Sequence, residues 1–130
     1  MSVEDVRESF SKQHFMTLIG ASLEHVGEGE VVIALPFRGD LVQQTGTIHA
    51  GVIAAIADSA CGYAALTKMP AGANVLSVEF KINLLAPAAG TRFVARARVI
   101  RAGRTLTTTA ADVFADETIV ATMLATMIRR

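Results

Sequence analysis

One carboxylate and one helix start are the parts of this sequence whose residue types and spacing could do chemistry. Asp58 is the only carboxylate between residues 41 and 78, and it interrupts an otherwise apolar stretch. A carboxylate is seldom buried without a partner or a function, so Asp58 is a candidate base or nucleophile. The first turn of a helix has free N–H groups and the positive end of the helix dipole. A helix that begins near His49 would therefore offer the N–H groups of Ala50 and Gly51 to an oxyanion.

The sequence from Gly46 to Leu66 predicts a helix of about twenty residues that positions both groups. At about 100° per residue, one face is bulky and the opposite face is small rather than charged. The bulky face carries Val52, Ile53, Ile56, Ala60, Tyr63 and Leu66. The small face carries Ala54, Asp58, Cys61, Gly62 and Ala65. A helix that is apolar nearly all round is a buried helix, and its small face could accept a close neighbour.

The predicted helix keeps the acid and the donors apart. Ala50 and Asp58 are eight residues apart in the sequence, which is about 12 Å along a helix. A nucleophile and the oxyanion donors must both lie within roughly 3 Å of the reacting centre. One chain therefore cannot supply both parts. A two-fold axis that sets two such helices antiparallel would bring Asp58 of one copy to the helix start of the other, which predicts two equivalent shared sites.

Composition excludes several classes of function. The 12 basic and 12 acidic residues give a net charge of zero, and no basic block indicates binding to nucleic acid or to an anionic membrane. The single cysteine indicates a reducing compartment, the acidic start is unlike a signal peptide, and no apolar run reaches the ~20 residues of a membrane span. We therefore expect a soluble, cytoplasmic protein with one domain over residues 1–130. Its apolar content of 52% favours an oligomer.

The other segments predict an α+β fold in which one antiparallel sheet wraps round the long central helix. Ser2 and Asp5 resemble a capping box, which would begin a short helix that ends near residue 13. The segments expected to form strands are 21–26, 31–35, 74–84, 91–101, 105–114 and 118–128. Each of the last four has one apolar face, which is typical of an antiparallel sheet covered on one side.

These residues and their order resemble the PaaI-type hotdog thioesterases. The resemblance extends over about residues 15 to 127, and its motifs are Gly46 to Gly51, Ala57-Asp58, Ser77 to Phe80, Ala86-Pro87-Ala88 and Gly90. It implies a hotdog fold, a homodimer or a dimer of dimers, and hydrolysis of acyl-CoA thioesters; we expect no metal and no cofactor. This chain has Ala50 where the family usually has glycine, and Gln43 where it usually has asparagine. Ala50 keeps the backbone N–H, and Gln43 keeps the amide on a longer side chain.

The resemblance also implies roles for the site residues. Asp58 would act as the nucleophile, giving a mixed anhydride, or as the general base for water, and the sequence leaves both open. Ser77 matches a position whose hydroxyl orients the water or the carboxylate, and Gln43 would help to hold the thioester or the carboxylate. Strand alternation places the side chain of Ser77 on the other face of the strand from Leu76 and Val78. Either that strand face also lines the site, or a bulge turns Ser77 toward it.

Several side chains have both a structural and a functional interpretation. His49 would stabilise the turn before the helix, or would contact the substrate as an acid or base. Arg101 and Arg104 flank a turn, where they would bind the phosphates of CoA or lie in solvent. Cys61 and Tyr63 are expected in the core. Besides acyl-CoA hydrolysis, a second function stays open, namely a non-catalytic module on the same fold that binds acyl-CoA or an aromatic ligand.

Overall fold

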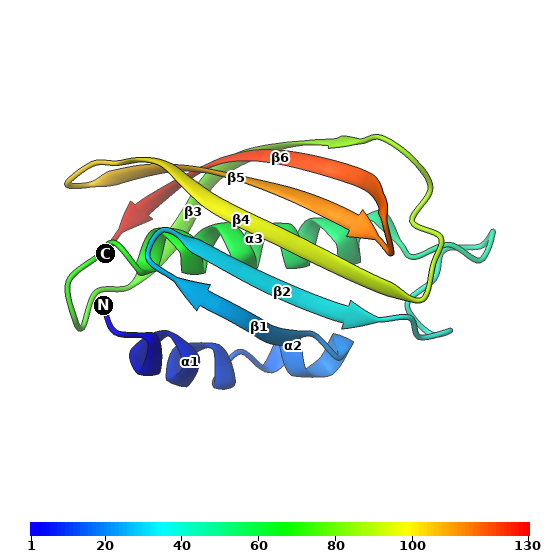
Figure 1. The fold of residues 1–130 in the computed structure, drawn as a ribbon, viewed down its shortest axis with the longest axis horizontal. Coiled ribbons are helices and arrows are strands. Elements are labelled where there is room, and N and C mark those ends of the chain that lie inside the picture. Colours follow the sequence, from blue (N-terminus) through cyan, green and yellow to red (C-terminus); the bar gives the residue numbers. More distant parts are fainter.

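The computed structural model describes residues 1–130, and in it a curled sheet wraps round a central helix (Figure 1). The helices are α1 (Val3–Ser11), α2 (His14–Ile19) and α3 (Ala50–Leu66), and the strands are β1 (Ser22–Gly27), β2 (Glu30–Pro36), β3 (Val75–Leu84), β4 (Arg92–Ala102), β5 (Leu106–Ala115) and β6 (Thr118–Arg129). The six strands lie in the order β1-β2-β4-β5-β6-β3, and all neighbours are antiparallel. The predicted α+β architecture is confirmed, with α1 and α2 lying along the β1 side of the sheet.

The N-terminal helix begins at the capping box that the sequence predicts. The Ser2 hydroxyl accepts a hydrogen bond from the Asp5 N–H at 3.1 Å, and the Asp5 carboxylate accepts one from the Ser2 N–H at 3.3 Å. α1 ends at Ser11, and a second helix, which the sequence pattern does not predict, follows it. This α2 ends where Gly20 takes a left-handed φ of 83°. Six residues are too few to show a helical period, which is why the sequence pattern does not predict α2.

The central helix α3 lies inside the curl of the sheet, as its apolar composition predicts. Cys61 and Ala65, which we expected on the small face, are fully buried, because a curled sheet covers more of the helix circumference than a flat one. Between residues 54 and 62, the half-exposed positions are Ala54, Ala55, Asp58, Ser59 and Gly62. A narrow side of small residues therefore remains uncovered, and the acid lies within it. No helix of the structure is both long and apolar enough to cross a membrane.

The two faces of the sheet differ as the alternation predicts for β4, β5 and β6. The inner face is rich in buried alanine, which lets α3 approach the strands closely, and includes Ala95, Ala97, Ala111, Ala121 and Ala125. The outer face carries the exposed Arg92, Arg96 and Arg98, as expected of a solvated surface. Arg92 forms an ion pair there with Glu24 at 2.9 Å.

Strand β3 departs from the predicted pattern because it is an edge strand. The sequence predicts one covered apolar face, yet Leu76, Val78 and Phe80 are 54%, 54% and 43% exposed. β3 pairs with β6 on one side only, and the sheet ends there. Its outer edge therefore has backbone groups without strand partners, next to large apolar side chains.

Candidate active site

A bulge in β3 places Ser77 against the acid. The register of the pairing with β6 shifts between Ser77 and Glu79, which leaves Val78 as an extra residue. Ser77 lies opposite the buried Met127, and its hydroxyl donates a 2.5 Å hydrogen bond to Oδ1 of Asp58. Of the two possibilities that the alternation left open, the bulge is the one found. The half-buried carboxylate of Asp58 thus has one fixed donor, and its second oxygen has no partner within the chain.

Asp58 and Ser77 line a cavity of about 250 Å³, which we term the acid cavity. Its walls come from the N-terminal segment, α3, β3 and the end of β6, and consist of Ser9, Gln13, Asp58, Ser59, Gly62, Tyr63, Leu66, Asn74, Val75, Leu76, Ser77 and Met127. Hydroxyl, amide and carboxylate groups are frequent among them. The acid cavity therefore suits water or a hydrogen-bonding group better than a hydrocarbon.

A hydroxyl that the sequence analysis assigned to the core also lines the acid cavity. The ring of Tyr63 is core, since the residue is only 5% exposed and packs edge-on against Phe10 with ring centroids 5.7 Å apart. Its hydroxyl accepts a hydrogen bond from Nε2 of Gln13 at 3.0 Å and lies 3.2 Å from the hydroxyl of Ser9. A buried tyrosine hydroxyl needs such partners. In the sequence, only the residue type of Tyr63 indicated a hydrogen bond at this position.

The start of α3 is capped by its own histidine. Nδ1 of His49 accepts a hydrogen bond from the Gly51 N–H at 2.7 Å. The cap engages this N–H in the structure, and the role of Gly51 as an oxyanion donor stays a prediction. The Ala50 N–H has no partner within the chain and remains available at the positive end of the helix. The turn-stabilising interpretation of His49 agrees with this geometry.

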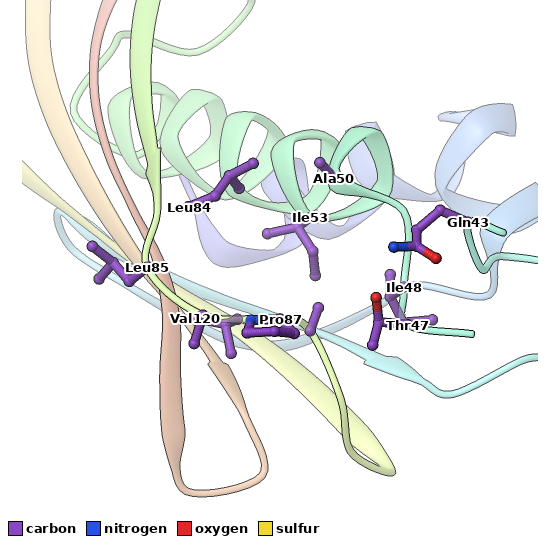
Figure 2. A pocket seen from close by; sticks show the side chains of 11 residues that line it. Gln43, Thr47, Ile48, Ala50, Ile53, Leu84, Leu85, Pro87 and Val120 are labelled. Atoms are coloured by element: carbon purple, nitrogen blue, oxygen red, sulfur yellow. The ribbon is translucent and has the colours of Figure 1, made fainter. Parts of the chain in front are cut away.

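The helix start opens into a second cavity of about 440 Å³, which we term the entrance cavity (Figure 2). Its walls consist of Gln43, Thr47, Ile48, Ala50, Ile53, Leu84, Leu85, Ala86, Pro87, Ala88 and Val120. Oε1 of Gln43 accepts hydrogen bonds from both the backbone N–H and the hydroxyl of Thr45. With its oxygen engaged, the amide of Gln43 turns its nitrogen toward the cavity, as Figure 2 shows. Gln43 can therefore act as a donor beside the Ala50 N–H.

The two halves of the candidate site do not meet within the chain. Asp58 and Ser77 line the acid cavity, whereas Ala50 and Gln43 line the entrance cavity, and no residue lines both. The α3 helix holds the two sets of groups at different heights along its axis. This is the separation that the sequence predicts from the spacing of Ala50 and Asp58.

Comparison with known proteins identifies the family. The family model described as the thioesterase superfamily matches residues 45–122, a segment that contains α3, β3, β4 and β5. The chain belongs to the thioesterase superfamily. A thioesterase family protein from Silicibacter pomeroyi is 44% identical to this chain, with 97% of this chain and 96% of that chain covered and a TM-score of 0.94. The fold is therefore the hotdog thioesterase fold that the sequence predicts.

More distant relatives of this thioesterase superfamily chain agree with that assignment. A variant of the phenylacetic acid degradation protein PaaI from Thermus thermophilus is 29% identical, covers 91% of this chain and 100% of that chain, and has a TM-score of 0.82. A Halobacterium salinarum protein described as a candidate esterase is 30% identical over 105 residues, which are 76% of this chain and 69% of that protein. The names of the Silicibacter pomeroyi and Halobacterium salinarum proteins refer to thioester or ester hydrolysis.

Two residues predicted to bind the substrate lie away from both cavities of this superfamily member. Arg101 and Arg104 are exposed near the turn between β4 and β5, and neither lines the acid cavity or the entrance cavity. Figure 1 shows this turn at the end of the molecule opposite the start of α3. Within one chain the structure does not bring these arginines to the site, because the β4–β5 hairpin carries them to the far end of the sheet.

The single cysteine of α3 is not a second nucleophile beside Asp58. Burial raises the pKa of the Cys61 thiol to about 11, so the thiol stays protonated at neutral pH and is no nucleophile. Cys61 is thus the core residue that the sequence predicts. No three His, Cys, Asp or Glu side chains gather closely enough to form a metal-binding group.

Proposed function

We propose that the chain is a cytoplasmic acyl-CoA thioesterase, which hydrolyses aryl-CoA or short- or medium-chain acyl-CoA to the free acid and CoA. The observation that carries the proposal is the hydrogen bond from Ser77 to Asp58 on the uncovered, small-residue side of α3. It fixes one carboxylate oxygen and leaves the other free to act on a ligand. Membership in the thioesterase superfamily supports thioester hydrolysis as the reaction.

The proposal requires a homodimer or a dimer of dimers. The edge of β3, with half-exposed Leu76, Val78 and Phe80, offers backbone groups and apolar side chains that a second copy would cover. A two-fold axis through this edge pairs the two β3 strands antiparallel and sets the two α3 helices antiparallel as well. Asp58 of one copy would then face Ala50 of the other, and the acid cavity of one copy would adjoin the entrance cavity of the other.

In such a composite site, the thioester carbonyl oxygen would accept hydrogen bonds from the Ala50 N–H and the Gln43 amide of one copy. Asp58 of the other copy would remove a proton from the attacking water, or would attack the carbonyl carbon itself and form a mixed anhydride that water then hydrolyses. By either route the carbon–sulfur bond breaks, the thiolate of CoA leaves and takes up a proton, and one water is consumed. Ser77 would hold the carboxylate in position. The proposed route uses no metal ion and no cofactor.

The test is the release of free thiol from a small panel of aryl-CoA and fatty-acyl-CoA substrates. Asp58→Asn keeps the size of the side chain but removes the base or nucleophile, and should lower kcat/KM by about 100-fold to 10,000-fold. Asp112→Asn is the matched control, because Asp112 lines neither cavity and bonds to Thr122 on the outer face of the sheet. Tight binding of acyl-CoA by the wild type without thiol release would contradict the proposal and would identify a non-catalytic binding module.

A further inference from the structure

The walls of the entrance cavity are mainly aliphatic. Eight of its eleven lining residues are hydrophobic, and none is charged or aromatic. Its two polar side chains, Gln43 and Thr47, lie together near the start of α3, whereas Leu84, Leu85 and Val120 form the opposite end (Figure 2). A group bound with its carbonyl at the helix start would therefore extend along aliphatic surface.

The acid cavity has the opposite character. Its volume is smaller, about 250 Å³, and the hydroxyls of Ser9 and Tyr63 and the amides of Gln13 and Asn74 line it around Asp58. A thioester of CoA has one hydrocarbon arm, the acyl group, and one arm that carries amides, the pantetheine. The amides of the pantetheine would find their hydrogen-bond partners in the acid cavity. The acyl group, which needs none, would then occupy the entrance cavity.

We propose that the preferred substrate carries a saturated, uncharged, aliphatic acyl group of medium length, bound in the entrance cavity. This inference rests on the proposed thioesterase function. A carboxylate on the acyl group would be buried there without a cation, and a hydroxyl at its far end would find no partner. An aryl group would gain no aromatic neighbour. The walls therefore select for plain hydrocarbon.

The volume of the entrance cavity sets the length of the chain. A methylene fills about as much space as one liquid water, ~30 Å³, and side chains and ligands pack at a density of about 0.74. The entrance cavity, of about 440 Å³, is open on one side, so its volume gives an upper bound of about ten carbons beyond the carbonyl and the sulfur. Each methylene that enters an apolar site should improve kcat/KM about threefold to fourfold until the cavity is full.

The experiment measures thiol release from acetyl-, butyryl-, hexanoyl-, octanoyl-, benzoyl-, hydroxyphenylacetyl- and succinyl-CoA. For the wild type, kcat/KM should rise with each methylene up to about octanoyl-CoA, and should be at least about tenfold lower for the charged and aryl thioesters. Ala86→Phe places a ring in the cavity and should lower kcat/KM for octanoyl-CoA by at least about tenfold, with a much smaller loss for acetyl-CoA. The preferred chain should become shorter.

Two further variants separate cavity filling from a damaged fold. Ala89→Phe adds the same ring in the same loop, at an exposed position that lines neither cavity, and should keep the wild-type preference. Leu85→Ala truncates a residue that is 53% exposed, so the core stays intact. It should reduce the advantage of octanoyl-CoA over butyryl-CoA, because it removes aliphatic contact at the far end of the cavity.

The outcomes that would overturn the inference are distinct from failure of the proposed function. An equal loss for all acyl groups in Ala86→Phe would show that the entrance cavity holds the pantetheine arm. A wild-type preference for an aryl, hydroxylated or charged acyl group would also overturn the inference, while the thioesterase function would stand. Absence of thiol release from every thioester in the panel would overturn the proposed function, and the inference with it.

Discussion

At the scale of single residues, the Ser77–Asp58 hydrogen bond is open to direct test. Ser77 donates a hydrogen bond to the carboxylate of Asp58, so in the proposed mechanism it positions that group. Hydrogen bonds to charged groups contribute about 1.5–3 kcal/mol, so Ser77→Ala should lower kcat by about 10-fold to 100-fold and leave KM nearly unchanged. Ser77→Thr keeps the hydroxyl and should restore most of kcat. Steady-state thiol release gives both constants; full kcat in Ser77→Ala would reduce Ser77 to an ordinary strand residue.

His49 offers a second test at this scale, because its ring caps α3 through the Gly51 N–H. Removing a cap typically costs about 1 kcal/mol, so His49→Ala should lower the free energy of unfolding by about that amount. His49→Asn supplies another good capping side chain and should recover the stability and most of the activity. Urea unfolding at a fixed chain concentration measures the difference. A stable but inactive His49→Asn protein would assign His49 to the chemistry instead.

At the scale of elements, hydrogen bonds to the carboxylate of Asp116 connect the β5–β6 turn to the start of β4. Asp116 has a left-handed φ of 50° and accepts hydrogen bonds from the Thr91 hydroxyl at 2.9 Å and from the N–H groups of Thr91 and Arg92 at 3.1 Å. These bonds, chiefly the one from the Thr91 hydroxyl, lower the pKa of Asp116 below its ordinary value. A lowered pKa in the folded state stabilises the fold above the unfolded pKa of about 3.9, and this stabilisation is lost as the pH falls through the folded pKa.

Asp116→Asn should therefore destabilise the fold at pH 7 and flatten its stability profile in acid. Asparagine tolerates the left-handed backbone, so the substitution removes the charge with little added strain. Urea unfolding of wild type and variant, repeated at pH values from about 7 down to about 3, should show a difference in free energy that shrinks toward the acid end. A difference of the same size at every pH would mean that the carboxylate charge contributes nothing to the turn.

Most elements could be predicted from the sequence because their patterns are local. Neighbouring residues alone determine the apolar run of α3, the two short strand segments at 21–26 and 31–35, and the period of two in the last four strands. The sequence offered a bulge near Ser77 as one of two possibilities but could not decide between them, because the bulge at Val78 depends on pairing with β6, about 50 residues away. The hydrogen bond from the Gly51 N–H to the cap depends on the ring orientation of His49, which the sequence does not show. The place of Gln13 in the wall of the acid cavity depends on how the N-terminal segment packs. Asp58 and Ala50 could be chosen as candidates because the lone acid and the start of the helix lie in one stretch of the sequence.

At the scale of the whole molecule, the proposed dimer uses two half sites from each chain, and one substitution is expected to disable one of these half sites alone. Ala50 is the first residue of α3, and His49 before it has φ −58° and ψ 137°, the conformation that a residue before proline favours. Proline is tolerated at the first helical position, where its missing N–H has no helical partner. Ala50→Pro should therefore leave the stability nearly unchanged and lower kcat by about 100-fold to 1,000-fold, the usual effect of losing one oxyanion donor.

A mixing experiment then decides whether the site is shared between copies. Ala50→Pro and Asp58→Asn chains should each be nearly inactive alone, but a mixed dimer has one site with both lesions and one site with neither. Random reassociation of equal amounts gives mixed dimers in half of the population, so activity should recover to about a quarter of that of the wild type. The control mixes each variant with itself through the same unfolding and refolding. A mixture no more active than its parts would place Asp58 and Ala50 in the same site of one copy, which the length of α3 between them opposes.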